Sequence, residues 1–257
     1  MRIDGKVVLI TGASEGIGAA CAAEFVRSGA RLALTARSEE GLRRAGGDKA
    51  LIVPGDLTSE ETRRRVVDST LQRYGQIDIL INNAGLGHYL PSWSESMDLT
   101  RRMMELNFFA LLGMVQLVAP HMRARRNGTI VNVGSIAGKM TLPWMTLYSA
   151  SKYAVGSLTE GLRMELRRDN VHAMLVCPGY VRTRFQQNVL AGGPPGDIER
   201  SRKFAITPER CAHDIRRGVE RGARTVMTPG VGWILIALCR LLPGLVQDRM
   251  ARMAESV

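Results

Sequence analysis

Tyr148 and Lys152 stand four residues apart in the stretch LYSASKYAVGS, residues 147–157. On a helix such a pair shares one face, with the two side chains stacked a turn apart. Most isolated pairs of this kind have a structural role, with the tyrosine packed and the lysine tip in water. A tyrosine has a pKa of about 10, and an adjacent ammonium stabilises its phenolate. The pair therefore has the chemistry for proton transfer if a reacting group lies beside it.

A glycine-rich turn follows the first apolar run, KVVLIT (6–11), and reads TGASEGIG (11–18). Glycine permits a tight turn and a close approach of the backbone to a ligand, and the amides that begin a helix favour a phosphate. The spacing G-x-x-x-G-x-G differs from the G-x-G-x-x-G dinucleotide fingerprint. Its position after a first strand nevertheless predicts a dinucleotide site formed by Gly12, Ser14, Gly16, Ile17 and Gly18.

The end of the second apolar run, LTARSEE, bears on the choice of cofactor. A site for NAD usually has an acidic residue there to bind the ribose hydroxyls, but this chain has Ala36 followed by Arg37. A guanidinium suits a 2′-phosphate, and a missing carboxylate removes repulsion against it. The sequence predicts that NADP(H) is preferred through Arg37, with NAD(H) as the alternative. Glu15 is a mild counter-signal, because it places an acid in the glycine turn.

Short β-branched runs alternate with longer segments of helical period along the whole chain. Strands that alternate with helices predict parallel βαβ units. We therefore expect an α/β fold with one Rossmann-type domain over residues 1–257, a doubly wound parallel sheet of about seven strands with helices on both faces. The expected strands are 6–11, 31–36, 50–53, 77–82, 129–134, 171–177 and 224–228, and the expected helices are 16–28, about 59–74, about 98–125 and about 147–168.

Composition narrows the function classes. The net charge of +11 comes largely from arginine clusters that end amphipathic segments before Gly or Asn, where cations complement the helix dipole. Because no nucleic-acid module accompanies them, we expect no nucleic-acid partner. The four cysteines and four histidines show no ligand spacing, so we expect no metal. The N-terminus shows no apolar signal segment, which favours the cytoplasm.

Several motifs in order resemble those of the short-chain dehydrogenase/reductase family, over roughly residues 5–230. They are TGASEGIG (11–18), GDLT (55–58), NNAG (82–85), Asn107 in MELNFFA, Ser135 in VNVGSIAG, YSASK (148–152) and PGYVRT (178–183). Ser135 precedes Tyr148 by thirteen residues, as in that family. One departure is the short segment between Arg37 and the third strand, which leaves room for a helix of barely two turns.

The resemblance implies roles for individual residues. Tyr148 would exchange the proton, Ser135 would bind the same substrate oxygen, Lys152 would tune the phenol and bind ribose, and Asn107 would hold a relay water through its backbone. Asp56 with Leu57 would contact adenine, and Asn82 would support the sheet. The remaining residues would bind the cofactor: Asn83, Ala84, Gly85, Pro178, Gly179, Val181 and Thr183, with Tyr148 and Lys152.

Two segments interrupt the alternation of strands and helices. Residues 184–207 contain GGPPG and read as a substrate lid or loop. Residues 231–257 form a hydrophobic and basic C-terminal extension, whose stretch GWILIALCRLLPGLV is too short and interrupted to span a bilayer. It could cover the core, form a subunit interface or contact a membrane surface peripherally. The extension resembles that of family branches acting on steroid or long-chain ketones.

The expected substrate pocket is largely apolar, which favours a hydrophobic ketone or secondary alcohol. Its expected wall comprises Leu86, Tyr89, Leu90, Ile136, Ala137, Leu142, Trp144, Met145 and Tyr180, with His88 and Lys139 as polar exceptions. A lone loop histidine is usually a surface residue, so His88 is given no role. The prediction is an NADP(H)-dependent ketone reductase; an NAD-dependent alcohol dehydrogenase and a non-catalytic nucleotide sensor or scaffold are the alternatives. The resemblance further implies a homo-dimer or homo-tetramer.

Overall fold

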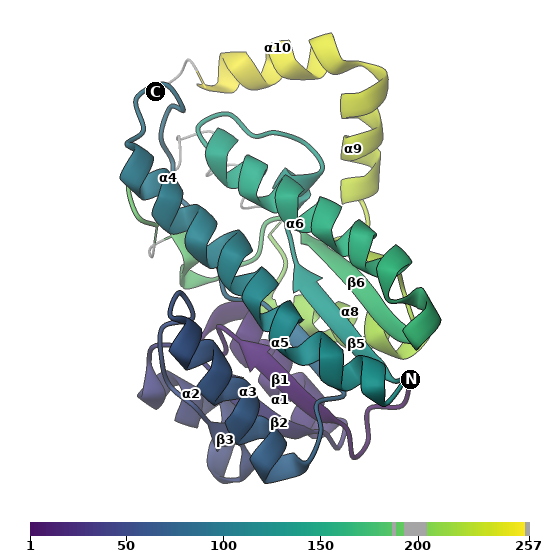
Figure 1. The fold of residues 1–257 in the computed structure, drawn as a ribbon. Helices are drawn as coiled ribbons and strands as arrows, with labels where there is room; N and C mark the ends of the chain where they lie inside the picture. The colour runs from purple at the N-terminus through teal and green to yellow at the C-terminus, as the bar shows by residue number, and fades with distance from the viewer. Residues whose placement is uncertain (187–188, 193–204, 255–257) are drawn as a thin grey trace.

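A computed structural model describes residues 1–186, 189–192 and 205–254 of the chain. Its centre is one sheet of seven parallel strands in the order β3-β2-β1-β4-β5-β6-β7 (Figure 1). The expected fold class is confirmed. The strands are β1 (Val7–Thr11), β2 (Arg31–Thr35), β3 (Leu51–Ile52), β4 (Ile79–Asn82), β5 (Gly128–Val133), β6 (Val171–Pro178) and β7 (Thr225–Thr228).

The strand order reverses direction between β1 and β4, because β1 pairs with β2 on one side and with β4 on the other. Leu9 is opposite Ala33 in β2 and opposite Leu80 in β4. In open parallel sheets, ligands bind beyond the carboxyl ends of the strands at such a reversal. The topology thus points to the ends of β1 and β4, where the TGASEGIG and NNAG motifs begin.

Helices cover both faces of the sheet, and each face has its own apolar core. On one face Phe25, Leu42 and Ile215 come from α1 (Gly16–Arg27), α2 (Glu39–Gly46) and α8 (Pro208–Arg221). On the other face Val66, Met114 and Val155 come from α3 (Glu60–Tyr74), α5 (Leu111–Ala124) and α6 (Thr146–Glu165). The strands between them are apolar on both sides, as expected for a parallel sheet.

Helix α8 was missing from the sequence prediction, although its ends carry clear signals. The Thr207 hydroxyl accepts a hydrogen bond from the Arg210 amide at 3.2 Å, and Pro208 occupies the first turn. The helix ends at Gly222 in the left-handed region, with a φ of 63°. A capping threonine, a proline in the first turn and a terminal glycine mark the start and the end of a helix in the sequence itself, without reference to tertiary packing.

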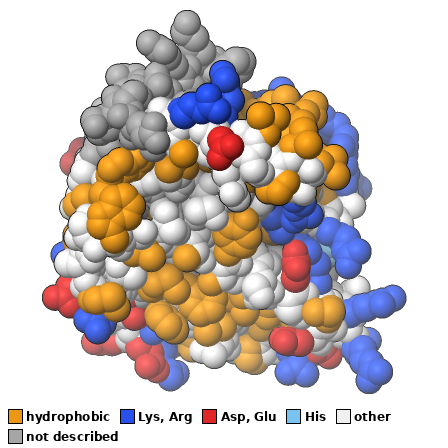
Figure 2. All heavy atoms as spheres, turned by 90° about the horizontal axis from the view of Figure 1, so that it is seen from above, with side chains coloured by type: hydrophobic (Ala, Val, Ile, Leu, Met, Phe, Trp, Pro, Cys, Tyr) orange, Lys and Arg blue, Asp and Glu red, His pale blue; other side chains and the backbone are white. Residues whose placement is uncertain are grey.

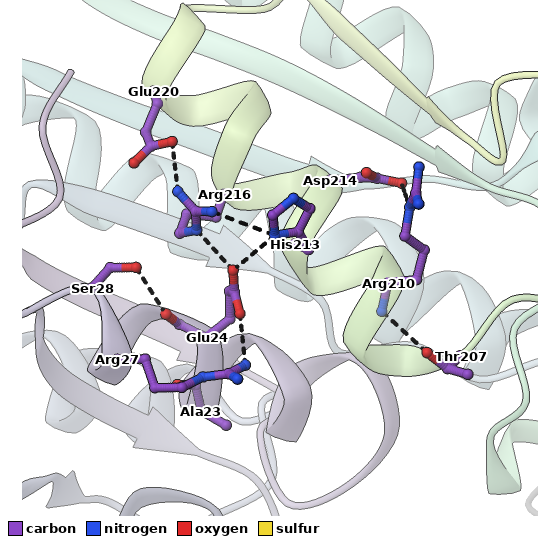
Figure 3. A network of polar contacts seen from close by, with 10 residues as sticks. All are labelled: Ala23, Glu24, Arg27, Ser28, Thr207, Arg210, His213, Asp214, Arg216 and Glu220. Carbon is purple, nitrogen blue, oxygen red and sulfur yellow. Dashed lines mark hydrogen bonds and ion pairs between the residues drawn. The ribbon is translucent and has the colours of Figure 1, made fainter.

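An ion-pair network joins α8 to α1 across one face of the sheet (Figure 3). The Glu24 carboxylate accepts from Arg216 Nε at 2.8 Å and from Arg27 Nη2 at 2.6 Å. His213 Nδ1 lies 3.2 Å from the same carboxylate, and Arg216 also donates to Glu220 at 2.6 Å. Because α1 begins at the glycine turn, this network fixes the helix that the predicted dinucleotide site depends on.

The segment Met97–Ala124 is continuous and is the one described helix long and apolar enough, by length and composition alone, to cross a membrane. It comprises α4 (Met97–Met104), a π-helical turn (Glu105–Ala110) and α5. Met103, Met114 and Val118 are fully or almost fully buried. Packing in the protein core therefore accounts for part of its apolar character, since 44% of the apolar stretch is buried.

The C-terminal extension consists of α9 (Gly232–Leu241) and α10 (Pro243–Ala254), with Pro243 beginning the second helix. The idea that this segment merely covers the core is wrong for most of it, because only Gly232 and Ile236 of α9 are buried. Figure 2 shows hydrophobic side chains gathered on this side of the molecule beside Lys and Arg. Among the described residues of the extension, the exposed large apolar ones are Val231, Trp233, Ile234, Leu235, Leu238, Leu241, Leu242 and Leu245.

Candidate active site

A cleft of about 2830 Å³ runs along the carboxyl edge of the sheet. It starts beside the first turn of α1, passes the ends of β4 and β5, and reaches α9 and α10. The wall includes residues from six motifs that lie far apart in the sequence: TGASEGIG, GDLT, NNAG, VNVGSIAG, YSASK and PGYVRT. The fold therefore brings six of the motifs to one continuous cavity.

The glycine turn needs its glycines for two different reasons. Gly12 and Gly16 have φ values of 63° and 57°, in the region that side-chain-bearing residues rarely adopt. A Cβ on Gly12 would lie 2.8 Å from Ala84 Cα, and one on Gly16 would lie 3.2 Å from Thr183 Cγ2. Gly18 differs, because it does not line the cleft; a Cβ there would collide with the Gly12 carbonyl oxygen. The structure thus gives Gly18 a packing role, and its direct contact with the cofactor stays a prediction.

Asn83 and Thr11 tie the NNAG turn to the glycine turn. The Asn83 side-chain amide donates to the carbonyl oxygens of Thr11 and Gly12 at 3.1 and 3.0 Å. The Thr11 hydroxyl in turn accepts from the amides of Asn83 and Ala84 at 3.0 and 3.1 Å. These bonds fix both turns before any ligand binds, which reduces the ordering that binding requires.

The first turn of α1 is suited to a phosphate. Its N-cap is Glu15 in an extended conformation, and no side chain caps the helix. Uncapped amides and the positive end of the helix dipole favour an anion. With the glycine cradle beside them, the residues present fit the pyrophosphate of a dinucleotide.

Arg37 stands at the end of β2 and lines the cleft with an exposed side chain. Among the described residues no hydrogen bond or ion pair involves Arg37, whereas Arg43 and Arg44 pair with Glu39 and Glu40. The short helix α2, expected from the sequence, is confirmed at eight residues. Asp56 also lines the cleft and accepts from the Thr58 amide and hydroxyl at 3.0 and 2.9 Å.

Ser135, Tyr148 and Lys152 meet on the cleft wall between the cofactor turn and the apolar end. Ser135 follows β5, and Tyr148 and Lys152 lie on α6, as the i, i+4 spacing predicts. Lys152 Nζ is 5.8 Å from the centre of the Tyr148 ring and donates to the Val133 carbonyl oxygen at 3.1 Å. The expected assembly of these three side chains is thus present.

Burial dominates the ionisation of this group. It raises the pKa of Tyr148 to about 12, although a hydrogen bond with Ser135 acts in the other direction. Burial also lowers the pKa of Lys152 to about 8. Without a cofactor, desolvation therefore outweighs the other effects on Tyr148, because burial penalises the tyrosinate and the ammonium alike. That Lys152 stabilises the tyrosinate stays a prediction.

Asn107 lies behind this group, fully buried, in the π-helical turn Glu105–Ala110. Its Oδ1 accepts from the Leu86 amide at 2.9 Å, and its Nδ2 donates to the Leu86 carbonyl at 2.9 Å and to Ser151 Oγ at 3.0 Å. A π-helical turn within an α-helix is rare and often marks a functional site. The sequence indicated the asparagine but not this turn.

The other end of the cleft is mainly apolar. Of the pocket residues expected from the sequence, Leu90, Ala137, His88 and Lys139 do not line it. The expected residues that do line it are Leu86, Tyr89, Ile136, Leu142, Trp144, Met145 and Tyr180. The structure describes only part of the predicted lid, residues 184–207, because residues 187–188 and 193–204 lie outside the described residues.

The C-terminal extension supplies a wall that sequence reasoning missed. Leu235, Leu238, Leu242 and Leu245 line the cleft, and Arg249 lies near its end. Leu235 and Leu238, three residues apart on α9, share a helix face, whereas Leu242 lies at the end of α9 and Leu245 on α10. The extension is therefore part of the cleft as well as an exposed surface.

Nearly all of the cofactor residues expected from the sequence lie on the cleft. Gly18 is the exception described above, and among the four expected catalytic residues Asn107 is the one behind the wall. The expected cofactor residues on the wall are Gly12, Ser14, Gly16, Ile17, Arg37, Asp56, Leu57, Asn83, Ala84, Gly85, Tyr148, Lys152, Pro178, Gly179, Val181 and Thr183. Among the described residues no cluster of His, Cys, Asp or Glu could hold a metal ion.

A doubly wound sheet with this cradle and this group of side chains defines a nicotinamide-dependent oxidoreductase of Rossmann type. The family model of short chain dehydrogenases matches residues 6–192, and the chain belongs to this family. A relative from Anopheles gambiae, named dehydrogenase/reductase SDR family protein 7-like, is 34% identical over 239 residues, covering 88% of this chain and 75% of its own.

Solved structures agree in fold and differ in their cofactors. A short chain dehydrogenase/reductase from Burkholderia phymatum in complex with NAD is 26% identical, with a TM-score of 0.85, covering 95% of this chain and 96% of its own. One from Burkholderia cenocepacia in complex with NADP is 28% identical, with a TM-score of 0.82, covering 97% and 99%. The cofactor of this enzyme is therefore a nicotinamide dinucleotide, and the 2′-phosphate is a separate question.

Proposed function

We propose that the protein is an NADP(H)-dependent oxidoreductase that reduces a hydrophobic ketone, or reversibly oxidises a secondary alcohol. The observation that carries this proposal is the meeting of Ser135, Tyr148 and Lys152 on a cleft continuous with the glycine cradle. Neither alternative explains the site as well. A sensor or scaffold has no use for a buried Tyr–Lys pair, and an NAD enzyme usually has a carboxylate where Ala36 stands.

In the proposed mechanism the nicotinamide supplies the hydride, and the chain supplies the proton and the geometry. Tyr148 gives its hydroxyl proton to the carbonyl oxygen as the alcohol forms, and Ser135 donates a hydrogen bond to that oxygen. A pKa of about 12 keeps the proton on Tyr148 at neutral pH, which suits a donor in the reductive direction. Lys152, with a pKa of about 8, remains mostly charged at pH 7 and favours the tyrosinate left behind.

The proton is restored through the interior. Asn107 would hold a relay water through its backbone, and its side chain fixes Leu86 and Ser151 around that point. Gly85 keeps the space open, because a Cβ there would lie 3.2 Å from Asn107 Oδ1 and 3.4 Å from Lys152 Nζ. This arrangement supports a path from Tyr148 through Lys152 toward Asn107.

The cofactor assignment is tested by calorimetric titration with NADPH and NADH side by side. Tight NADPH binding with weak NADH binding would support Arg37 as the 2′-phosphate partner. A preference for NADH would overturn it and favour the alcohol dehydrogenase alternative. Binding of neither would favour the scaffold alternative.

The chemistry is tested with Tyr148→Phe. The variant is expected to lose carbonyl reduction by at least about a hundredfold, the lower range for one acid–base group, while NADPH binding changes little. Substantial residual turnover would refute the role of Tyr148. Tyr153→Phe on the same helix, half-exposed and outside the cleft lining, is the matched control.

For the extension we propose peripheral contact of a cytoplasmic enzyme with an anionic membrane surface. Exposed leucines of α9 and α10 lie beside Arg240, Arg249 and Arg252, a pattern that suits an anionic interface. Co-flotation with phosphatidylserine vesicles and not with phosphatidylcholine vesicles is expected. A protein that floats with neither would instead favour a subunit interface.

A homo-dimer or homo-tetramer is the proposed assembly. The helices that carry Asn107 and Tyr148 leave apolar side chains in solvent, with Phe109 50%, Tyr153 43% and Met164 73% exposed. Burial of such side chains between copies would remove apolar area from water. Sedimentation equilibrium distinguishes the assemblies, and a monomer at all concentrations would contradict the proposal.

A further inference from the structure

The loop of residues 86–90, after the NNAG turn, carries a buried histidine that the reaction does not use. His88 is fully buried, so the expectation of a surface residue is wrong. Its neighbours Leu86 and Tyr89 line the apolar end of the cleft. Gly87 lies against the catalytic tyrosine, since a Cβ there would be 3.4 Å from Tyr148 Cδ2. The position of this loop therefore sets the shape of the site where a carbonyl must sit.

Backbone hydrogen bonds hold the loop at both ends. The Leu86 amide and carbonyl both bond to the Asn107 side chain at 2.9 Å. The Leu90 amide donates to the Trp144 carbonyl at 2.9 Å. The middle of the loop is also held by backbone bonds.

On either side of His88, the Tyr89 amide donates to the Ala191 carbonyl at 3.0 Å and the Gly87 carbonyl accepts from the Leu190 amide at 2.9 Å. The His88 side chain itself turns away from the cleft and into the protein.

That side chain meets the segment that leads into α4. His88 Nε2 lies 2.9 Å from Glu95 Oε1, with the two side chains 1% and 0% exposed. Thr100 of α4 also donates to Glu95 Oε1, at 2.8 Å. Among the described groups, Glu95 is the charged one that acts on His88, whose pKa is lowered by burial against the opposing effect of Glu95.

The pair is incompletely satisfied. Both ring nitrogens of His88 and Glu95 Oε2 are buried without a well-aligned hydrogen bond to any described group. Burying polar groups in this way costs free energy, and an apolar pair of similar volume is often neutral or stabilising. A pair that is costly for folding suggests a role in the site that it supports.

We propose that His88 and Glu95 are positioning residues, which hold the loop 86–90 against the catalytic helix and so fix the carbonyl-binding side of the cleft. The contact links the loop, whose first residue bonds to Asn107, to Glu95, and Thr100 bonds Glu95 to the helical segment on which Asn107 lies. Two side chains thus join the substrate wall to the predicted proton relay. The inference about the loop stands on geometry, and its effect on the reaction rests on the proposed function.

The first test is hydrogen exchange by mass spectrometry on the full chain, comparing the wild type with His88→Leu/Glu95→Met, His88→Gln and Glu95→Gln. The double variant is expected to unfold no earlier than the wild type, because no unpaired buried charge remains. Amides of 86–90 are expected to exchange about tenfold faster, a loss of about 1.4 kcal/mol of local stability, while Ile79–Asn82 stay unchanged. Unchanged exchange at 86–90 in the double and both single variants would overturn the proposal.

The second test is kinetic, with NADPH and acetophenone as the probes. The double variant is expected to raise KM for acetophenone about tenfold with little change in the NADPH Kd, the result of a misplaced substrate wall. His88→Gln, which keeps a donor, is expected to fall between it and the wild type. Wild-type KM in a stable double variant would show a merely structural pair and overturn the role.

His172→Leu is the matched control, because it removes an imidazole far from the loop 86–90. His172 lies at the amino end of β6, where its ring bonds to the Ala223 carbonyl at 2.8 Å. It is expected to leave exchange at 86–90 unchanged. If the wild type does not reduce acetophenone while exchange at 86–90 responds as expected, the proposed activity toward this probe fails and the positioning of the loop stands.

Discussion

Replacing Asn107 by leucine tests how far this one side chain holds the site together. Leucine has a similar size but no polar atoms, so the fully buried position loses three hydrogen bonds of 2.9 to 3.0 Å. The partly buried Leu86 amide and carbonyl lose their side-chain partner, and a group left unpaired away from water costs about 1–3 kcal/mol. Ser151 is affected less, because its hydroxyl still donates to the Tyr148 carbonyl at 2.7 Å.

The expected loss of unfolding free energy is therefore about 2–6 kcal/mol. For a chain of this size each kcal/mol lowers Tm by about 2–4 °C, which gives a fall of about 4–24 °C. The assay is thermal unfolding followed by circular dichroism without cofactor. Ser151→Ala, which removes one of the three bonds and also the bond from Ser151 to the Tyr148 carbonyl, is expected to lower Tm by about 2–8 °C, for a loss of about 1–2 kcal/mol.

Turnover is then measured well below the Tm of each variant. Asn107→Leu is expected to reduce kcat at least about tenfold even when folded, because both the relay and the Leu86 position are disturbed. An Asn107→Leu protein that unfolds within 2 °C of the wild type, a difference of about 1 kcal/mol or less, would refute the reasoning about unpaired groups. Lower stability with unchanged kcat would leave Asn107 a structural role alone.

Arg37→Ala is expected to raise the NADPH Kd about tenfold, since an exposed charged hydrogen bond is worth about 1.4 kcal/mol. Calorimetry should show that this variant binds NADH as the wild type does, and that the control Arg43→Ala keeps the wild-type NADPH Kd. Burial raises the pKa of Glu24, but bonds from Arg216 and His213 outweigh it and hold the pKa below 4.5. Its stabilisation is thus present above pH 4.5 and lost on acidification; urea titrations should show a weaker acid dependence in Glu24→Gln. Burial lowers the pKa of His88 below 6.5, so the unfolded chain binds more protons and stability falls as pH drops below 6.5. His88→Gln should reduce that fall, and an identical pH profile would contradict it.

Local patterns in the sequence determined the strands of the sheet, most of the helices and the side chains of the candidate active site. Alternation of apolar runs and helical segments is a short-range property, and all seven expected strands are present. Tyr148 and Lys152 share a face because the helix repeat requires it. The glycine turn carries its own conformational requirement, since Gly12 and Gly16 need positive φ.

Other features depend on what surrounds each residue, and only the tertiary structure decided them. The pKa of Tyr148 rises because packing excludes water from its hydroxyl. His88 has a role in the core because the loop turns its ring toward Glu95.

The C-terminal extension shows the same division between local and long-range information. Its apolar period was visible in the sequence, but which surface those side chains meet was not. Leu235 and Leu242 line the cleft because α9 leaves the sheet beside β7 and α10 turns back at Pro243. A sequence specifies which side chains are apolar and how they are spaced along a helix. Which cavity they enclose follows from contacts between segments more than a hundred residues apart, and those exist only in the folded chain.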